Sequence, residues 1–581
     1  MSQTSKFLQK AVTRRQFVTA VTSGTAAMSA AAVFGRQDQG VTFTVAAQVP
    51  PAGGTVAAAS TLSGAVRPLT LSAFEPGGGL AAAERLKTLL LTDPSGQPYH
   101  LLSKVRTDGT ATIELPAGKF EMTMILPVRD FGQVYLYADN GGALYPPSLT
   151  GELLLNYEFA RSRAAFVRRY VKAAEAEGVV FSTGVTERLE RGEAALAKAS
   201  DAGEPAARVG HSNDSLADTM WAGEMAAVER ARHHIARNGP RPGFLFGCNA
   251  FGYTKSDEYV MDLLLKLGEN DHAYAYAKSD EYGRLYRDLL NYATVPFYRA
   301  ATEKVEGHPD YSAVDAILEE LAGSGILPKG HPLIWLHRGG IPEFLKTKSW
   351  AEIKQSCREY ILRSVGRFRS RIHTWDVINE AHDSANELGF DHQQLLELTR
   401  LAADTTRVAD PTAFRVVNSC CTWGEYVAKG RNYNGVMRQP IRTPLQYYKV
   451  LEDAGVSYDA VGLQLYNPVR DMLEIERHVE RFFVFGKPVH VTELGVPSGN
   501  PSEVRMNTEN PWHGTAWTQQ VQADWVEQFY TICYSKPQVQ AITWWDFADP
   551  AFIKNGGLVD EKFQPKQSYD RLRRLILSWK V

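Results

Sequence analysis

The chain has few of the residues that would indicate a disulfide-stabilised or metal-dependent protein. It contains five cysteines in 581 residues, too few for a disulfide framework, and the odd number leaves at least one of them unpaired within the chain. Neither a CxxC nor an HExxH pattern occurs, so two common zinc-site signals are missing. The adjacent Cys420 and Cys421 fit two small residues beside a strand end better than a redox or metal site. We expect no metal and no cofactor.

Net charge and long apolar segments are also lacking. The formal net charge is only −2, which argues against nucleic acid or an anionic membrane as a partner. Residues 18–34 are weakly apolar and rich in small side chains, too short for a permanent membrane span. They follow the run TRRQFV at residues 13–18, which looks like a twin-arginine export signal. We therefore expect residues 1–36 to be an export signal, the alternative being a basic tail, and the mature protein to be periplasmic or extracellular without membrane attachment.

Tryptophan is absent between residues 41 and 150, where short β-like runs are interrupted by Gly and Pro. The runs at residues 41–45, 110–115, 120–126 and 133–137 predict a small all-β domain, sandwich-like in form. A carbohydrate-binding role would need aromatic side chains that stack on sugar rings. Four tyrosines are candidates for it, namely Tyr99, Tyr135, Tyr137 and Tyr145. Because tyrosines in strands are more often packing residues, a packing role is the favoured interpretation.

The remainder of the chain shows first a helical pattern and then an alternation of strand and helix patterns. Residues 151–240 are rich in Ala, Glu, Arg and Leu at helical spacing, which predicts a helical connector that contacts both neighbouring regions. From residue 242 to 581, short β-branched runs alternate with amphipathic helices, which predicts a (β/α)₈ barrel. The predicted strands cover residues 244–248, 292–295, 332–335, 374–378, 414–417, 460–464, 489–492 and 541–544. The predicted helices include residues 314–322, 350–367 and 393–408.

Two of these predicted strands end in a glutamate. Residues 375–380 read WDVINE and residues 489–493 read VHVTE. Since the carboxyl ends of barrel strands meet at one face, Glu380 and Glu493 form a candidate pair. Cleavage of a glycosidic bond needs two such carboxyl groups, one protonated and one ionised. Either glutamate alone would be better explained as a capping or salt-bridging residue.

These segments resemble glycoside hydrolase family 10, the endo-β-1,4-xylanase family, whose motifs look like WDVVNE and ITEL. The resemblance implies that Glu380 is the acid/base and Glu493 the nucleophile of a double-displacement mechanism. It also implies that Asn379 donates a hydrogen bond to the sugar 2-hydroxyl. We expect the surroundings of Glu380, beside Trp375 and the neutral Asn379, to raise its pKa.

Further segments carry the same resemblance. KGHPLIW at residues 329–335 is similar to the family's RGHTLVW and implies that His331 and Trp335 lie near the sugar before the scissile bond. GLQ at residues 462–464 implies that Gln464 contacts the nucleophile region, and ADP at 409–411 followed by Asn418 resembles the approach to the fifth strand. One of Trp544 and Trp545 is expected to close over the sugar, and both stay candidates.

Several positions depart from the family pattern. Tyr466 stands where the family usually has a histidine, and we expect it to replace the hydrogen bond of that histidine to the nucleophile. Residues 335–338 read WLHR instead of WHSQ, and residues 294–300 read TVPFYRA without the Glu-Asn and Lys-Trp that bind the glycone. The nucleophile motif ends in Leu494 and Gly495, without an aspartate. Sugar contacts are therefore changed while both carboxyl groups are kept.

The function predicted from the sequence is a retaining endo-type β-glycosidase that hydrolyses a β-1,4-linked polysaccharide, xylan by default. Its partner would be the polysaccharide alone, and a monomer is the default expectation. Three alternatives stay open: a barrel that binds glycans without turnover, a retaining enzyme on another β-glycan, and a transglycosylase. The retained pair, with Asn379, favours catalysis because binding alone needs neither a nucleophile nor a proton donor.

Overall fold

The structure is a computed structural model of the chain. It describes residues 69–100, 103–106, 108–253, 280–382, 385–432, 435–436, 441–466, 468–499, 512–549, 551–553 and 555–580. The predicted export signal and the predicted strand at residues 41–45 lie outside these ranges. None of the helices within them is both long and apolar enough to span a membrane.

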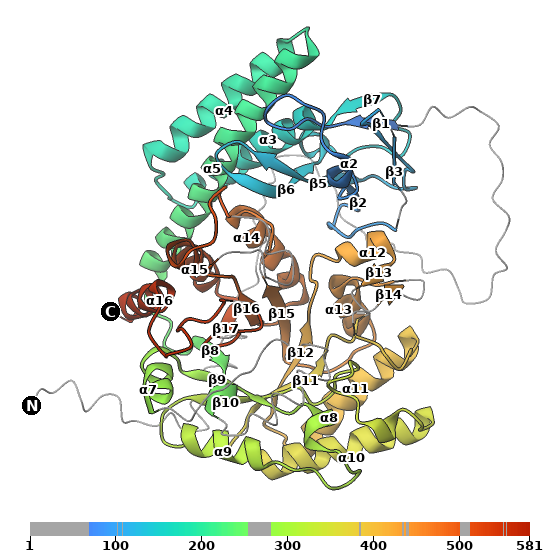
Figure 1. Cartoon of the computed structure of the whole chain (residues 1–581), viewed down its shortest axis with the longest axis vertical. Coiled ribbons are helices and arrows are strands. Elements are labelled where there is room, and N and C mark those ends of the chain that lie inside the picture. Colours follow the sequence, from blue (N-terminus) through green and yellow to red (C-terminus); the bar gives the residue numbers. More distant parts are fainter. Residues whose placement is uncertain are drawn as a thin grey trace, which may run out of the picture.

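Eight parallel strands close into a barrel in the C-terminal part of the chain, which confirms the predicted (β/α)₈ fold (Figure 1). The strands follow one another around the barrel in sequence order, and the last, β17, pairs with the first, β8. They are β8 (Leu245–Asn249), β9 (Tyr292–Pro296), β10 (Leu327–His331), β11 (Thr374–Asn379), β12 (Phe414–Ser419), β15 (Ala460–Tyr466), β16 (Val489–Gly495) and β17 (Val539–Trp544).

Helices surround the barrel, and some of them begin at clear sequence signals. Three of them start at capping boxes, in which a Ser, Asp or Thr side chain and a Glu or Gln three residues later satisfy each other's backbone N–H groups. The helices are α7 (Asp280–Leu289), α8 (Arg299–Thr302), α9 (Ser312–Leu321), α10 (Trp350–Phe368), α11 (His392–Ala409), α12 (Glu425–Lys429), α13 (Pro444–Asp453), α14 (Met472–Arg481), α15 (Gln519–Tyr534) and α16 (Gln567–Ser578). Short 3₁₀ turns lie at Phe251–Tyr253, Glu343–Leu345 and Phe482–Phe485, and a two-stranded ribbon pairs β13 (Arg431–Asn432) with β14 (Gly435–Val436).

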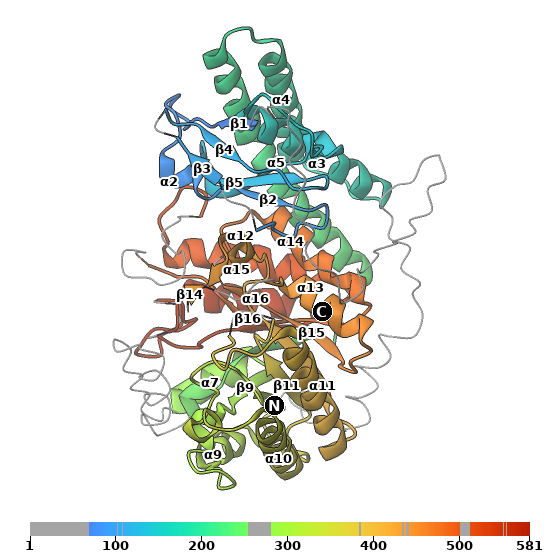
Figure 2. The ribbon, with the colours of Figure 1, turned by 90° about the vertical axis from the view of Figure 1, so that its right-hand side faces the viewer.

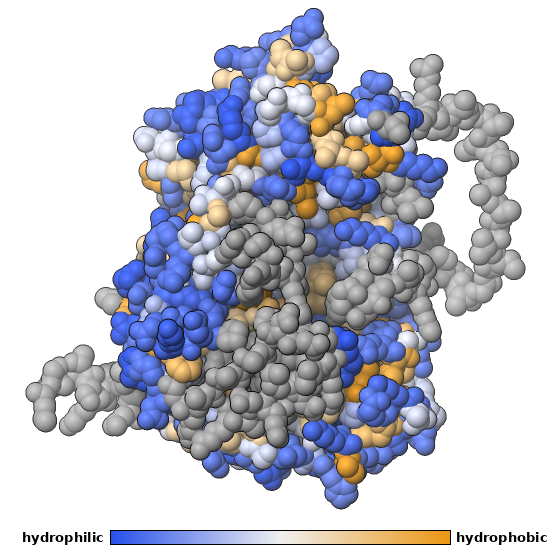
Figure 3. Space-filling view, in the orientation of Figure 1, coloured by the Kyte–Doolittle hydropathy of each residue, from blue (hydrophilic) through white to orange (hydrophobic). Residues whose placement is uncertain are grey.

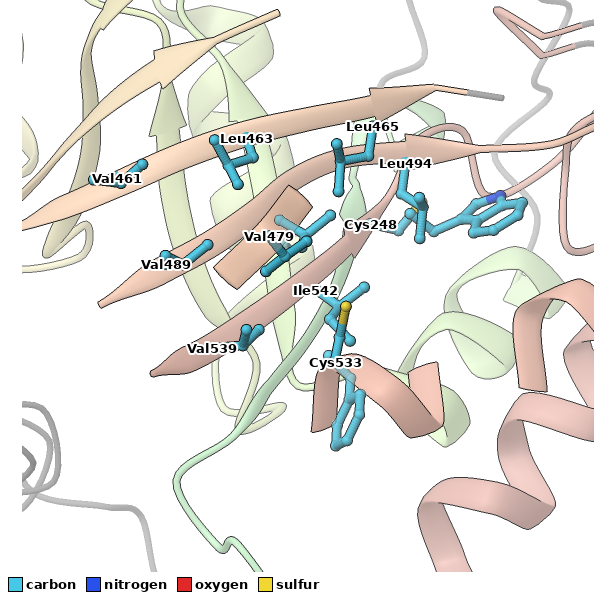
Figure 4. Close-up of a cluster of buried hydrophobic side chains, with 14 of the residues drawn as sticks. Cys248, Val461, Leu463, Leu465, Val479, Val489, Leu494, Cys533, Val539 and Ile542 are labelled. Carbon is cyan, nitrogen blue, oxygen red and sulfur yellow. The ribbon is translucent and has the colours of Figure 1, made fainter. Parts of the chain in front are cut away.

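The main core lies between the strands and these helices. Figure 4 shows a part of it, in which Val461, Leu463 and Leu465 from β15 pack beside apolar side chains of β16 and β17. Val479 of α14 and Cys533 of α15 complete the cluster from the helix layer. Burial on both faces explains why these strands read as continuous β-branched and leucine-rich runs. All five cysteines of the chain are free thiols.

The third barrel strand lies earlier than the predicted residues 332–335, which is a correction. Strand β10 spans Leu327–His331 and pairs with β9 over its whole length. Strand propensities do not predict β10, because it contains Pro328 and Gly330, and both residue types are depleted in strands. The apolar run that follows is held beside β11 only by irregular pairing, with a bridge between Trp335 and Asn379. The backbone N–H of Leu333 donates to the carbonyl oxygen of Asp376, and that of Asn379 donates to the carbonyl oxygen of Ile334.

The N-terminal region contains two small sheets that share one core. One sheet has the order β3-β4-β1-β7 and the other β2-β5-β6. Their strands are β1 (Leu69–Ser72), β2 (Leu90–Thr92), β3 (Ser103–Val105), β4 (Ala111–Ile113), β5 (Glu121–Val128), β6 (Gly132–Ala138) and β7 (Glu152–Leu154), with the short helix α2 (Ala83–Leu86) and a 3₁₀ turn at Asn140–Gly142. β1 pairs with β7 in parallel and with β4 in antiparallel fashion.

Three helices join the two parts of the molecule: α3 (Leu155–Ala176), α4 (Thr183–Asp201) and α5 (Pro205–Asn238). The first turns of α3 enter the core of the β region through Phe159, while Val167 and Val171 lie in the core of the barrel. Helix α5 does the same with Leu216 and Ala226. Figures 1 and 2 show α5 running from the β region down to the barrel. One set of helices therefore serves two cores.

Candidate active site

Both candidate glutamates lie at the carboxyl ends of barrel strands, β11 and β16, which are separated in the barrel by β12 and β15. Glu493 is a residue of β16, and its backbone is opposite Gln464 of β15. Glu380 directly follows β11, and its backbone has a φ of 56°. That left-handed conformation is costly for a residue with a Cβ, and such outliers gather at functional sites. The turn directs the Glu380 side chain away from the path of the strand.

The Glu380 carboxylate is buried, with 7% of the residue exposed, and accepts hydrogen bonds from side chains of two other strand-end segments. Trp335 Nε1 donates to Oε2 at 3.0 Å, and Gln464 Nε2 donates to Oε1 at 2.9 Å. The prediction that Gln464 contacts the nucleophile region is therefore imprecise: its backbone pairs with Glu493, but its side chain serves Glu380. A register shift between Leu463 and Gln464 accompanies this arrangement.

The Glu493 carboxylate is buried as well, with 5% of the residue exposed. The Tyr466 hydroxyl donates to Oε2 at 2.6 Å, and Asn418 Nδ2 donates to Oε1 at 3.0 Å. His331 Nε2 lies 3.8 Å from the same Oε1. Tyr466 thus makes the contact that the sequence suggested for it.

A chain of amide side chains connects the two carboxylates. Asn379 Oδ1 accepts hydrogen bonds from Asn418 Nδ2 at 2.8 Å and from Gln464 Nε2 at 3.2 Å. This orients the Asn379 amide, because its oxygen faces the two donors and its Nδ2 hydrogens remain for donation. Gly462 leaves room for the chain, since a Cβ at this position would lie 3.0 Å from Asn418 Oδ1. That contact gives a physical reason for the glycine of the GLQ segment.

The pKa values of both glutamates are raised above their usual range. Burial is the main cause for Glu380, opposed by hydrogen bonds from Gln464, Trp335 and Asn379. For Glu493, burial and then the neighbouring charge of Glu380 raise the pKa, while the Tyr466 hydroxyl and Lys329 act against the rise. The sequence predicted a raised pKa for Glu380 only. Since two close buried carboxylates cannot both ionise cheaply, the pair holds one proton near neutral pH.

A buried charged group lies behind the nucleophile. Asp376 Oδ2 is 2.8 Å from Lys329 Nζ and 2.7 Å from His331 Nδ1, and Lys329 and Asp376 are completely inaccessible to solvent. The positive charge of Lys329 and the hydrogen bond from His331 hold the pKa of Asp376 down against burial. Burial lowers the pKa of His331, so its imidazole is neutral, with Nδ1 on Asp376 and Nε2 toward Glu493. Sequence reasoning missed Asp376 and Lys329, although charged residues within buried strands were a usable signal.

Aromatic rings line the side of the site next to β9, β10 and β17. The Tyr298 ring lies 5.6 Å from that of His331 and 5.7 Å from that of Trp335, measured between centroids. Trp545 contacts His331 at 5.4 Å, and His337 stacks on Trp335 at 4.4 Å. Tyr298 was not recognised from the sequence as a site residue, because it stands in the segment without the family's polar residues.

The two adjacent tryptophans have different positions. The indole of Trp545 lies in the aromatic group just described. Trp544 is fully buried, and its Nε1 donates to the carbonyl oxygen of Gly556 at 2.9 Å. The structure therefore brings Trp545, and not Trp544, to the site. In the described ranges no group of three or more His, Cys, Asp or Glu side chains is arranged to hold a metal ion.

Comparison with known proteins relates the sequence of the barrel to one protein family. Residues 298–575 match the sequence model of Glycosyl hydrolase family 10. Endo-1,4-beta-xylanase B of Thermotoga neapolitana is 25% identical over 267 residues, which are 42% of this chain and 68% of that protein. Endo-1,4-beta-xylanase/feruloyl esterase of Xylanibacter ruminicola is 26% identical over 305 residues, 46% of this chain and 39% of that protein.

Solved structures include xylanase 10B from Thermotoga maritima, which is 18% identical and covers 60% of this chain and 97% of its own, with a TM-score of 0.41. The fold assignment here rests on the closed parallel strand order itself. The family match begins just after β9 and ends within α16, so it takes in six of the eight barrel strands and both glutamates. The barrel of this chain belongs to glycosyl hydrolase family 10 as a divergent member.

Proposed function

We propose that the barrel is a retaining endo-type β-glycosidase that hydrolyses a β-1,4-linked polysaccharide, with xylan as the first candidate substrate. One observation carries the proposal: two buried strand-end glutamates are joined by the amides of Asn379, Asn418 and Gln464. A barrel that only binds glycans has no use for two carboxylates that must share a proton. The similarity to proteins named endo-1,4-beta-xylanases supports the choice of xylan.

The first step of the proposed mechanism transfers the sugar to the protein. Glu493, ionised, attacks the anomeric carbon, the bond to the leaving oxygen breaks, and Glu380 gives its proton to that oxygen. The new ester bond between the sugar and Glu493 removes the charge that had raised the cost of ionising Glu380. Glu380 is then a carboxylate and takes a proton from water. The water oxygen attacks the anomeric carbon and releases Glu493.

The neighbours of the pair have distinct tasks in this scheme. The Asn379 Nδ2 group is oriented to donate to the sugar 2-hydroxyl, a contact that strengthens as positive charge develops on the ring. Tyr466 and Asn418 hold the two oxygens of Glu493 and so fix the direction of attack. Trp335 and Gln464 hold Glu380 in the same way. This is preorganisation by fixed dipoles in a site largely closed to solvent.

The glycone side is where the substrate preference of this chain should depart from its relatives. Tyr298 presents a ring beside His331 and Trp335, in the segment that lacks the family's polar glycone-binding residues. Buried sugar hydroxyls without partners are costly, by about 1–3 kcal/mol each. The second candidate substrate is therefore another β-1,4-glycan, one whose sugar would leave fewer hydroxyls without hydrogen-bond partners beside Tyr298.

A panel of β-linked polysaccharides assayed for new reducing ends tests the proposal. The wild-type chain should release reducing ends from at least one polysaccharide, while Glu493→Gln and Glu380→Gln should not. Following the anomer by NMR at early times should show retention of the β configuration. Activity that survives Glu493→Gln, or an initial α product, would overturn the mechanism. Binding without any turnover would favour the glycan-binding alternative.

We also propose that the chain is exported and acts as a monomer outside the cytoplasm. The TRRQFV run supports export, and a polymer-degrading activity needs access to a substrate too large to enter a cell. Fractionation of cells that express the full chain, compared with an Arg14→Lys/Arg15→Lys variant, tests the route. Retention of wild type in the cytoplasm would contradict it.

A further inference from the structure

The N-terminal β region rests on loops that leave three consecutive barrel strands, β12, β15 and β16. These are the strands that carry Glu493 and both of its hydrogen-bond donors. In Figures 1 and 2, α12 and α14 lie directly beneath the β region. His100 Nδ1 lies 3.1 and 3.2 Å from the carbonyl oxygens of Val427 and Ala428. The backbone N–H of Tyr135 donates to the carbonyl oxygen of Val469 at 3.2 Å. Gly132 and Trp512 form a β-bridge.

One buried cation, Arg470, connects these parts. Its guanidinium carbon lies 3.6 Å from the centroid of the Tyr135 ring and 5.0 Å from that of Trp423. Its Nη2 makes an ion pair of 2.7 Å with Glu425 Oε1 at the start of α12. Only 5% of Arg470 is exposed, and a desolvated guanidinium over an aromatic face is among the stronger cation–π contacts. Arg470 thus ties the β region to the loops after β12 and β15.

Short stretches of chain join Arg470 to the site. Tyr466, at the end of β15, comes shortly before Arg470, and its hydroxyl is 2.6 Å from the nucleophile. Asn418 of β12 comes shortly before Glu425 and donates to the other oxygen of Glu493. Arg470 itself is therefore close along the chain to Tyr466, and its partner Glu425 is close along the chain to Asn418, the other donor on Glu493.

Helices α3 and α5 fix the other end of the same loop. Arg163 of α3 makes a buried ion pair of 2.8 Å with Asp471, and Glu224 of α5 accepts the backbone N–H of Met472 at 3.2 Å. A buried pair that loses one partner leaves an uncompensated charge, so both halves are held together strongly. The loop between β15 and α14 is clamped at Val469, Arg470 and Asp471 by groups from outside the barrel.

The tyrosines of the β region support a packing role. Tyr135 faces Arg470, the ring of Tyr137 lies 5.3 Å from the guanidinium of Arg477, and Tyr145 donates to Glu158. Tyr99 packs against the core of the β region. Because their faces or hydroxyls are engaged by the protein itself, these rings are poorly placed to stack on sugar. In the part of the surface that Figure 3 shows uncovered, apolar residues are scattered in small groups.

We propose that the N-terminal region is a built-in positioning element of the active site, and that Tyr135 and Arg470 act through the loop after β15 to hold the Tyr466 hydroxyl on Glu493. The inference deepens the proposed function and rests on it for its activity readout. Tyr135 and Arg470 are positioning residues, since neither touches the reacting groups. The region is then an obligatory half of the enzyme and not a detachable carbohydrate-binding module.

The ionisation of Glu493 gives a readout that needs no turnover. The charged and titratable groups around it are Glu380 and Asp376 from the β11 segment, Lys329 and His331 from β10, and Tyr466 from β15, with Asp546 and Tyr298 beyond Tyr466. The infrared carbonyl stretch of protonated Glu493, identified by its loss in Glu493→Gln, follows this titration directly in the full-length chain. Weaker donation from Tyr466 leaves the carboxylate less stabilised and moves its titration to higher pH.

The test is a double-mutant cycle on Tyr135 and Tyr466. Tyr135→Ala and Tyr466→Phe should each move the Glu493 titration to higher pH, and the double variant should move it no further than Tyr466→Phe alone. Tyr135→Ala should also lower kcat/KM by about fivefold, the size of coupling expected from a remote positioning contact. Tyr135→Phe keeps the ring over Arg470 and should behave as wild type. Tyr137→Ala removes a ring from the same interface, over α14, and should leave the titration in place.

Additive shifts in the double variant, no shift in Tyr135→Ala, or an equal shift in Tyr137→Ala would overturn the proposal. If Tyr135→Ala does not fold, Arg470→Lys replaces it, because lysine keeps the charge beside Glu425 and loses the planar contact with Tyr135. Failure of the proposed function has a different signature. In that case the wild type releases no sugar from any glycan while the infrared titrations still report on the interface.

Discussion

Glu380 and Glu493 are both buried and both accept hydrogen bonds from neutral donors, yet their wider surroundings differ in kind. Glu493 lies within strand β16, against the buried group of Lys329, Asp376 and His331. Glu380 lies just past a strand end, in a left-handed backbone conformation, and accepts from an indole and an amide that carry no charge. Both carboxylates are thus held by neutral donors, but only Glu493 also lies against a buried charged group.

This difference has a chemical meaning. The proposed nucleophile must be ionised and fixed in direction, and charged neighbours couple its ionisation to the rest of the barrel. The proposed acid/base must gain and lose a proton during one turnover, and its donors Trp335 and Gln464 carry no charge that would commit it to one state. Substitutions that act on one glutamate and not the other should therefore separate the two roles.

The largest effect is expected from the glutamates themselves. Glu493→Gln should lower kcat by ~10⁴-fold or more on every substrate, because no other group can form the covalent intermediate. Glu380→Gln should lower kcat by ~10²- to 10⁴-fold on polysaccharide and much less for glycone transfer from an aryl glycoside whose leaving group needs no proton. Burst kinetics with such an aryl glycoside would show the trapped intermediate. Equal losses of kcat for both variants on both substrates would contradict the separate roles of nucleophile and acid/base.

The second largest effect concerns stability. Asp376→Asn leaves Lys329 without a counter-charge at a site with no solvent access. We expect the free energy of unfolding to fall by about 3–5 kcal/mol, measured by urea denaturation, since a buried charge loses its partner. Glu380→Gln, which breaks no ion pair, is the matched control and should unfold close to wild type. A small loss for Asp376→Asn would mean that the buried group contributes little to holding the nucleophile side.

Tyr466→Phe should have an intermediate effect on the nucleophile side. The Tyr466 hydroxyl acts against the rise in the pKa of Glu493, so its loss should raise that pKa further. Activity needs ionised Glu493, and therefore the acid limb of the kcat/KM profile should move to higher pH. We expect kcat/KM at the optimum to fall about tenfold, the value of one strong hydrogen bond to a charged group. An unmoved acid limb would show that the hydroxyl does not control the nucleophile.

Trp335→Phe is the corresponding change on the acid/base side and should have the smallest effect. The indole N–H acts against the rise in the pKa of Glu380, and phenylalanine keeps an aromatic ring without that donor. Because activity needs protonated Glu380, the basic limb should move to higher pH while the acid limb stays. Loss of kcat/KM should be about threefold, the lower range of a neutral donor to a carboxylate. Movement of the acid limb instead would contradict the separation of the two sides.

Much of the barrel was predictable because burial on both faces leaves a continuous apolar signal in parallel strands. Strand β11 was predicted to within one residue, and β9 and β12 began where the pattern placed them. Strand β10 was not, because Pro328 and Gly330 interrupt its pattern and pairing with both neighbours decides its position. Local propensity cannot register a partner strand that lies elsewhere in the chain.

The site was predictable only in part for a related reason. The motif order pointed to both glutamates, and Tyr466 was recognised as a substitute for a histidine. Whether Trp544 or Trp545 faces the site depended on the rotation of β17, which sets one indole on Gly556 and the other on His331. Tyr298 and Asp376 were missed because their roles come from neighbours on other strands.

The sequence by itself determined the kinds of groups available: two strand-end glutamates, the amides and tyrosine beside them, and a run of β-branched segments that must be buried. These follow from residue type and spacing, which act locally along the chain. The tertiary structure decided which donor serves which carboxylate, how the buried charge of Lys329 is balanced, and which strand-end loops the N-terminal region clamps. Those outcomes depend on contacts between segments far apart in the chain, where distance and burial in three dimensions set the energies of hydrogen bonds and charges.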